Sequence, residues 1–191
     1  MKITCVLGSP RQNGNSTLMA RAFLDTAAGL GADITLYTLN DMTVRGCQGC
    51  MACKTTIDHC VIRDDLTQVL ESLASTDVLL LASPIYYGNV SSQLKAFIDR
   101  SYSLLVPDYM TNPRPHRLPD GKQMVMFLTQ GYPDENSFND VFPQYDFFYQ
   151  WHGFKPNHLL RACGVGRAGH VTDMPEILQS ARDLAKKLCS G

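Results

Sequence analysis

The feature that most constrains this fold is a fivefold alternation of buried strands and amphipathic helices. Five apolar or β-branched runs have the length and composition of strands: 2–7, 34–39, 77–83, 122–129 and 157–163. Apolar residues at helical spacing follow each run, at 18–30, 66–73, 92–105, 138–151 and 175–188. This alternation predicts an α/β fold, with a doubly wound parallel sheet of five strands and helices on both faces.

The chain of 191 residues is long enough for one α/β domain with a sizeable core, so we predict a single domain over 1–191. Two segments depart from the alternation: a cysteine-rich loop at 46–61 and a proline-rich excursion at 107–119, which is expected over the surface. The net charge of −1 leaves no basic surplus to neutralise phosphates, which argues against nucleic acid as a partner.

Membrane association and export are not indicated by the apolar runs. None of them approaches the roughly 20 residues of a membrane helix, and the first, of about six residues, is too short for a signal peptide. Seven cysteines in such a chain favour a reducing compartment, where thiols serve metals or redox chemistry. We therefore expect a cytoplasmic protein with no membrane partner.

The first strand ends in a turn that is rich in hydroxyl and amide groups. The strand stops at Gly8, and a helical pattern begins at Leu18. The free backbone amides and the dipole of a helix N-terminus favour an anion at this position. The residues of this phosphate turn (residues 8–17) that offer donors or charge are Ser9, Arg11, Asn13, Asn15, Ser16 and Thr17. An ordinary N-cap at Asn15 or Ser16 is the alternative, but the order of strand, break and helix favours a phosphate.

The turn lacks both common nucleotide signatures. It has no Gly-Lys-Ser/Thr ending, and no G-x-G-x-x-G pattern for a dinucleotide. Side-chain hydroxyls and amides suit a terminal monophosphate, such as that of FMN. The run Gly8-Ser9-Pro10-Arg11-x-x-Gly14-Asn15-Ser16 resembles the NAD(P)H-dependent FMN reductase family, which has a flavodoxin-like fold.

This resemblance implies the flavodoxin-like strand order 2-1-3-4-5, with a ligand crevice at the carboxyl ends of strands one and three. It also implies FMN as cofactor, NAD(P)H as electron donor, and a homo-oligomer, a dimer or a tetramer, in which a neighbouring subunit covers the flavin. The aromatic-rich segment 138–151 and the excursion 107–119 are the candidates for that cover.

Two further turns follow the third and fourth strands, and this order makes strands one, three and four neighbours in succession. We expect them to face the same crevice and to contact the flavin through Pro84, Ile85, Tyr86, Tyr87, Gly88, Asn89, Thr129, Gln130 and Gly131. The alternative is that the tyrosines pack as ordinary core or rim aromatics. A third glycine-rich pattern, G-x-G-x-x-G at 164–169, has no strand after its helix and is interpreted as a surface connection.

The cysteine loop (residues 46–61) has the spacing C-x2-C-x2-C-x6-C, formed by Cys47, Cys50, Cys53 and Cys60. Two-residue spacers let successive sulfurs face one ion or cluster. The pattern resembles that of the iron–sulfur flavoproteins, a branch of the same family with a four-iron cluster (4Fe–4S) beside FMN. Zinc and a loop without metal are the alternatives. We expect the loop at the edge of the flavin crevice.

Two functions follow from these patterns. The first is an FMN-dependent oxidoreductase, which takes electrons from NAD(P)H and passes them to a quinone, a flavin or another small-molecule or redox-protein acceptor. The second is a non-catalytic electron-transfer or redox-sensing module in which the cysteine loop is the working part. The sequence nominates no catalytic acid or base.

Overall fold

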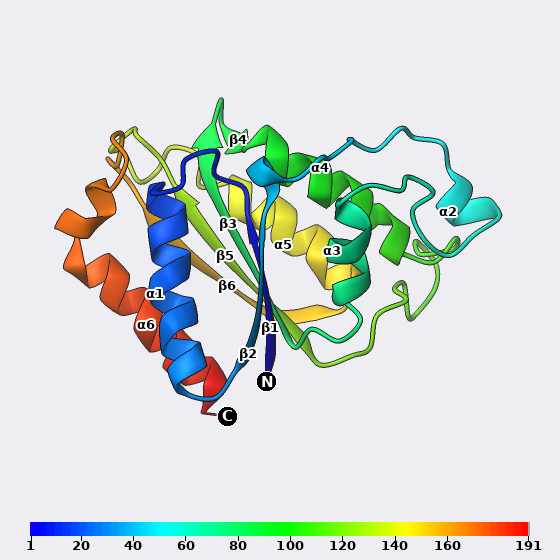
Figure 1. Ribbon diagram of the computed structural model, residues 1–191. Helices are drawn as coiled ribbons and strands as arrows, with labels where there is room; N and C mark the ends of the chain where they lie inside the picture. Colours follow the sequence, from blue (N-terminus) through cyan, green and yellow to red (C-terminus); the bar gives the residue numbers. More distant parts are fainter. Residues whose placement is uncertain (191) are drawn as a thin grey trace.

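The computed structural model describes residues 1–190 and contains one parallel sheet (Figure 1). The strands follow the spatial order β2 (Asp33–Thr38), β1 (Lys2–Leu7), β3 (Val78–Tyr86), β5 (Lys122–Thr129) and β6 (Phe154–Ala162). A short β4 (Asn89–Val90) pairs antiparallel with the end of β3. Counting the five long strands alone, the predicted order 2-1-3-4-5 is confirmed.

Helices cover both faces of this sheet, as the alternation predicted. On one face lie α1 (Asn15–Gly29) and α6 (Pro175–Cys189), and on the other lie α3 (Leu66–Ser72), α4 (Ser92–Ser101) and α5 (Val141–Trp151) (Figure 1). Successive residues of a strand point to opposite faces, so Leu80 packs toward α1 whereas Leu79 and Leu81 pack toward α4. All three are fully buried, which explains why this strand is apolar throughout.

Short helical elements lie outside these layers. The helix α2 (Ala52–Thr55) belongs to the cysteine loop, and three 3₁₀ turns are η1 (Leu39–Asp41), η2 (Tyr102–Leu104) and η3 (His170–Asp173). No helix among residues 1–190 combines the length and the apolar character needed to cross a membrane.

Two elements begin or end at places that apolar periodicity does not predict. The helix α1 begins at Asn15 instead of Leu18, because its first turn consists of polar residues that are nonetheless buried. The strand β3 continues through Pro84 to Tyr86, where a turn was expected, and the chain reverses at Tyr87 and Gly88. Both residues have positive φ (49° and 76°), as a tight two-residue hairpin turn requires.

Candidate functional site

The phosphate turn is fixed to the middle of the sheet by its backbone. The Gly8 amide donates to Ala82 O on β3 (2.8 Å), and the Gly8 carbonyl accepts from Ser91 Oγ, at the N-cap of α4 (2.7 Å). A Cβ on Gly8 would lie 2.7 Å from the Cβ of Leu94, so glycine is the residue that this close approach allows. The turn therefore begins in a fixed position between β1, β3 and α4.

The helix N-terminus that follows has donors without partners. Leu18 makes the first backbone hydrogen bond of α1, to Gly14 O (3.0 Å), so the amides of residues 15–17 have no partner within the helix. The N-cap Gly14 supplies no side chain to satisfy them. The Ser16 hydroxyl is buried and has no hydrogen-bond partner among residues 1–190. Three free amides and an unpaired hydroxyl at one helix end fit a phosphate group.

Asn15 and Ser9 have other roles. The Asn15 amide nitrogen donates to Val165 O and Arg167 O (2.9 Å each), and its oxygen accepts from the Val171 amide (3.0 Å). This side chain is thus occupied, and Asn15 can offer an anion only its backbone amide. Ser9 Oγ is engaged with the backbone of Arg11 (3.2 Å).

The segment 164–169 braces the phosphate turn. Besides its bonds with Asn15, it donates from Gly169 N to Asn13 O (3.1 Å), and Gly166 O accepts from the exposed Arg11 (3.4 Å). Val165 is buried, so the segment is not simply the surface connection that the sequence suggested. The backbone groups of this glycine-rich segment thus help to hold the phosphate turn in place.

The three expected turns do share one edge of the sheet, because they follow the carboxyl ends of the adjacent strands β1, β3 and β5. Tyr87 is fully exposed and Tyr86 half-exposed, whereas Ile85 is buried below them. The Asn89 side-chain oxygen accepts from the Val90 amide and from the Tyr145 hydroxyl. Aromatic faces and polar groups thus border this edge.

Of the third turn, Thr129 and Gln130 are buried and Gly131 is exposed. The Gln130 side chain donates to Tyr132 O and Asp134 O (2.9 Å each) and accepts from Arg161. It holds the turn from below, which leaves Gly131 as the residue of this turn that is open to a ligand.

All four predicted cysteines line one cavity of about 80 Å³, together with residues from the end of α4 and from η2. Cys47 and Cys50 are exposed, and Cys53 and Cys60 half-buried. Among residues 1–190 no group of three or more His, Cys, Asp or Glu side chains is arranged to hold a metal ion. That result excludes thiolates converging on one atom in this arrangement. In a four-iron cluster each thiolate binds a different iron, so the ligands surround a shared space, and this donor set fits such a group.

The loop lies farther from the phosphate turn than expected. The turn contacts the beginning of α4, whereas the cysteine cavity is lined by Asp99, Arg100 and Tyr102 at its end. The ten residues of α4 separate the two by about 15 Å. The cysteine cavity therefore does not lie beside the phosphate turn, as a position at the edge of the crevice would require, because the two are at opposite ends of α4.

A buried ion pair that the sequence did not reveal fixes both ends of the cysteine loop. Arg100 is fully buried and donates to both carboxylate oxygens of Asp64 (2.6 Å), to Arg45 O (3.2 Å) and to Ile62 O (2.9 Å). Burial disfavours the Asp64 charge, but hydrogen bonds from Arg100 and from the Arg45 and Leu66 amides leave its pKa below the ordinary value.

Lys54 ties the loop to η2 and Leu105, and Arg117 ties it to the excursion. The buried Lys54 ammonium donates to Tyr102 O (2.6 Å) and Leu105 O (2.9 Å) and lies 3.7 Å from Cys53 Sγ. Burial lowers the pKa of Lys54, and the adjacent Cys53 opposes that shift. Arg117 donates to Cys53 O (3.2 Å). Long-range contacts therefore hold the short helix of this loop.

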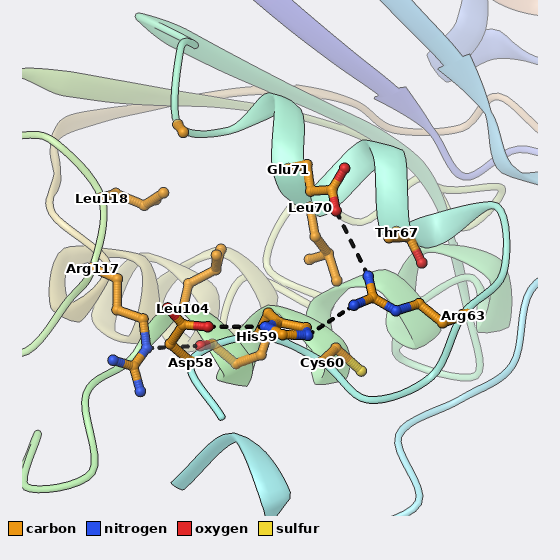
Figure 2. Close-up of a pocket in the computed structure, with 12 residues that line it drawn as sticks. Asp58, His59, Cys60, Arg63, Thr67, Leu70, Glu71, Leu104, Arg117 and Leu118 are labelled. Atoms are coloured by element: carbon orange, nitrogen blue, oxygen red, sulfur yellow. Dashed lines mark hydrogen bonds and ion pairs between the residues drawn. The ribbon is translucent and has the colours of Figure 1, made fainter. Parts of the chain in front are cut away.

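Between the cysteine loop and α3, a pocket of about 310 Å³ lies beside Cys60 (Figure 2). Its charged groups pair with one another. His59 contacts Asp58 (2.9 Å) and Arg63 (2.8 Å), and Arg63 lies 3.8 Å from Glu71. The side chains of His59 and Asp58 are exposed to solvent.

Comparisons with known proteins identify the family of this chain. The family described as NADPH-dependent FMN reductase matches residues 1–133. An iron–sulfur flavoprotein of Methanocaldococcus jannaschii is 38% identical over 112 residues, which cover 59% of this chain and 58% of that protein. One from Methanosarcina thermophila is 38% identical over 104 residues, 54% of each chain. The chain thus spans a little over half the length of these curated relatives.

Solved structures resemble the whole described fold. An FMN-dependent NADH-azoreductase from Bacillus anthracis, solved with FMN, superposes with a TM-score of 0.76 at 16% identity and covers 99% of this chain and 100% of its own. An NAD(P)H:quinone oxidoreductase from Methanothermobacter marburgensis gives 0.73 at 16% identity, covering 98% and 96%. These likenesses support the fold, and the family match identifies the lineage: the chain belongs to the NADPH-dependent FMN reductase family.

Proposed function

We propose that this protein is an oxidoreductase that holds FMN in the crevice and takes electrons from NAD(P)H. The observation that carries the proposal is the N-terminus of α1, where three backbone amides and the buried Ser16 hydroxyl have no partner among residues 1–190. A dianionic phosphate would satisfy these donors, and the adjacent Arg11 would add charge.

The remaining site residues would position the flavin ring. FMN, when bound, supplies hydride and electron transfer. Gly88 and Gly131 offer backbone groups at the crevice edge, and Tyr86 and Tyr87 offer aromatic faces that shield a flat ring from water. Gln130, Asn15 and Thr129 would support the site from beneath. All three are buried, and the side chains of Gln130 and Asn15 are bonded to neighbouring loops.

Steady-state turnover tests this proposal. The purified protein with FMN should oxidise NADPH or NADH continuously when a quinone or free flavin is supplied as acceptor. A single stoichiometric oxidation that does not continue would contradict an enzyme and would favour an electron carrier.

The second candidate is an iron–sulfur flavoprotein that acts as an electron-transfer or redox-sensing module. It is favoured by the shared cavity of Cys47, Cys50, Cys53 and Cys60, and by relatives that bear that name. A visible spectrum of protein purified without oxygen separates the possibilities. Flavin bands alone would leave the loop without a cluster, whereas broad additional absorption that bleaches on reduction would support one.

We further propose that the protein works as a homo-oligomer, a dimer or a tetramer. Tyr87 is fully exposed at the crevice rim, with Tyr86 and Tyr132 about half-exposed nearby, and exposed aromatic side chains of this size often have a partner. Sedimentation of the FMN-loaded protein at micromolar concentration should show a species larger than one chain. A stable monomer would overturn this part of the proposal.

A further inference from the structure

Lys54 is a buried cation in contact with the cysteine cavity. It follows the third cysteine of the loop directly, in the short helix α2, and keeps only 8% of its surface exposed. Its ammonium donates to Tyr102 O (2.6 Å), to Leu105 O (2.9 Å) and to Cys53 Sγ (3.7 Å). An ammonium has three donors and no acceptor, and these three contacts use all of its donors. The surroundings of Lys54 are therefore those of a charged side chain.

This charge has no carboxylate partner. The ion pairs among residues 1–190 involve other cations, and none of them includes Lys54. The ammonium lies 4.0 Å from the centroid of the Tyr102 ring, but a ring face carries no net charge. A buried charge without a counterion is costly, so a negative group is expected close to Lys54.

A second cation, Arg117, adds to this imbalance of charge. Arg117 donates to Cys53 O (3.2 Å) and to Ser103 O (3.3 Å), and it forms no ion pair in the part of the chain that the structure describes. The Asp58 carboxylate acts on Arg117 from a distance, but its side chain is 80% exposed, so water screens its charge. Two cations thus meet at Cys53, and the sulfur of that residue, as a thiolate, is the group placed to balance them.

An iron–sulfur cluster held by the four cysteines would supply the missing negative charge. The four thiolates leave such a cluster with a net negative charge, and the uptake of one electron makes that charge larger by one unit. Cys53 would be one of the ligands, and its sulfur is the one that Lys54 contacts. The reduction potential of a cluster depends on its net charge and on hydrogen bonds to its sulfurs. Lys54 therefore offers both of these influences at one ligand.

We propose that Lys54, supported by Arg117, provides the counter-charge for an iron–sulfur cluster in the cysteine cavity and raises the reduction potential of that cluster. This inference rests on the second candidate function, the iron–sulfur flavoprotein. A positive charge beside Cys53 stabilises the reduced cluster more than the oxidised one, because the reduced cluster carries the larger negative charge. A higher potential favours electron flow toward the cluster.

The midpoint potential of the cluster tests this inference. Anaerobically reconstituted protein is titrated with dithionite, and the EPR signal of the reduced cluster is followed, so the measurement does not depend on turnover of NAD(P)H. Lys54→Met has a side chain of similar length without the charge. It should lower the midpoint potential by about 59 mV, which corresponds to a tenfold change in the one-electron equilibrium.

Two further variants of Lys54 separate its charge from its packing. Lys54→Gln keeps donors for the carbonyl oxygens of Tyr102 and Leu105 but carries no charge, so it replaces Lys54→Met if that variant does not fold. Its potential should fall by a similar amount. Lys54→Arg keeps the charge and should retain most of the original potential. A potential equal to that of the unaltered protein in the two neutral variants, at full iron content, would overturn the inference.

Arg117→Gln removes the second cation. It should lower the potential in the same direction but less, by about threefold in the one-electron equilibrium, because Arg117 bonds to the carbonyl oxygen of Cys53 and not to its sulfur. A rise in potential would contradict the supporting role of Arg117.

A second buried lysine serves as the matched control. Lys122 keeps 4% of its surface exposed and donates to the carbonyl oxygens of Ala74 and Thr76, which lie outside the cysteine loop. Lys122→Met should therefore lose the same kind of contacts and leave the potential of the cluster unchanged. A shift as large as that of Lys54→Met would assign the effect to general loosening of the fold and would refute the role of Lys54.

Iron content separates this inference from the function on which it rests. If the unaltered protein binds no iron after reconstitution, the iron–sulfur candidate fails, and the counter-charge role of Lys54 is refuted with it. If every variant holds iron and the potential does not respond to the charge at Lys54, the role of Lys54 is wrong and the cluster stands. Neither result bears on FMN binding at the phosphate turn.

Discussion

The phosphate turn and the cysteine loop are both irregular segments after a strand, but they are held in opposite ways. The phosphate turn is held mainly through backbone groups: Gly8 bonds to β3 and α4, Asn13 O accepts from Gly169 N, and residues 15–17 are buried at the start of α1. The cysteine loop contains exposed residues and is held by charged side chains, by Arg100 at its ends and by Lys54 and Arg117 in its middle.

This difference shows two ways of preparing a site. Backbone amides at a helix end are aimed as soon as the helix forms, so little further structure is needed to receive an anion. The cysteines depend on charged side chains that pair across the fold, because a four-residue helix cannot hold itself in position. We therefore expect the two segments to respond independently to mutation.

The largest effect should come from the cysteines themselves. Anaerobically reconstituted protein is expected to contain about four iron and four sulfide ions per chain, and replacing Cys47, Cys50, Cys53 or Cys60 with Ala should remove most of them. FMN should stay bound, because the phosphate turn is a separate element. Cys189→Ala, in the last helix, is the control and should keep its iron. Iron-free unaltered protein after reconstitution would leave the loop without a cluster.

Removing the buried arginine should loosen the cysteine loop next. Arg100→Leu leaves the Asp64 charge without its partner and should lower the free energy of unfolding by about 3–5 kcal/mol in urea. Thiol reagents should then react faster with the loop cysteines.

Lys95→Ala, which breaks an exposed pair on the same helix, is the matched control and should cost less than about 1 kcal/mol. Should Arg100→Leu fail to fold, Arg100→Lys keeps the charge, loses the paired geometry and should fall between the two. Equal stability of all three variants would contradict the role of this pair.

The phosphate turn should respond more modestly. Ser16→Ala removes one donor to the phosphate and should weaken FMN binding about tenfold to a hundredfold, measured by flavin fluorescence. Stability without FMN should not fall, because the hydroxyl has no partner to lose. Arg11→Gln should weaken FMN binding in a salt-dependent way. Ser180→Ala, on the exposed face of α6, serves as control. If Ser16→Ala and Arg11→Gln both keep full affinity for FMN, the phosphate binds elsewhere.

The smallest effect concerns pH. The depressed pKa of Asp64 means that its pair with Arg100 adds stability above the ordinary carboxyl pKa of about 3.9, and that this stability is lost as the pH falls through the lower folded value. Unfolding free energies between pH 5 and pH 2 should therefore fall more steeply in the unaltered protein than in Asp64→Asn. Parallel curves would assign the acid sensitivity to other carboxylates, such as the exposed Asp58 and Asp183, whose pKa values are also lowered.

The parallel sheet and the place of the phosphate turn could be predicted from the residues themselves, and the strand order from the family resemblance. Strand and helix periodicities are local, and the continuous apolar run at 77–83 requires cover on both faces. The bounds of α1 and β3 could not, because Asn15 is buried by hydrogen bonds to a segment about 150 residues away, and Pro84 is tolerated where the strand approaches its end.

The sequence by itself therefore determined the alternating strands and helices of the parallel sheet and the polar break between β1 and α1, since each depends on neighbouring residues in the chain. Only the tertiary structure decided which donors remain free: Asn15 and Gln130 are bound into loops, and Ser16 is not. It alone placed the cysteines at the far end of α4, with Arg100 opposite Asp64. Pairings across 36 residues and more leave no periodic trace in the sequence, because they arise when the layers pack.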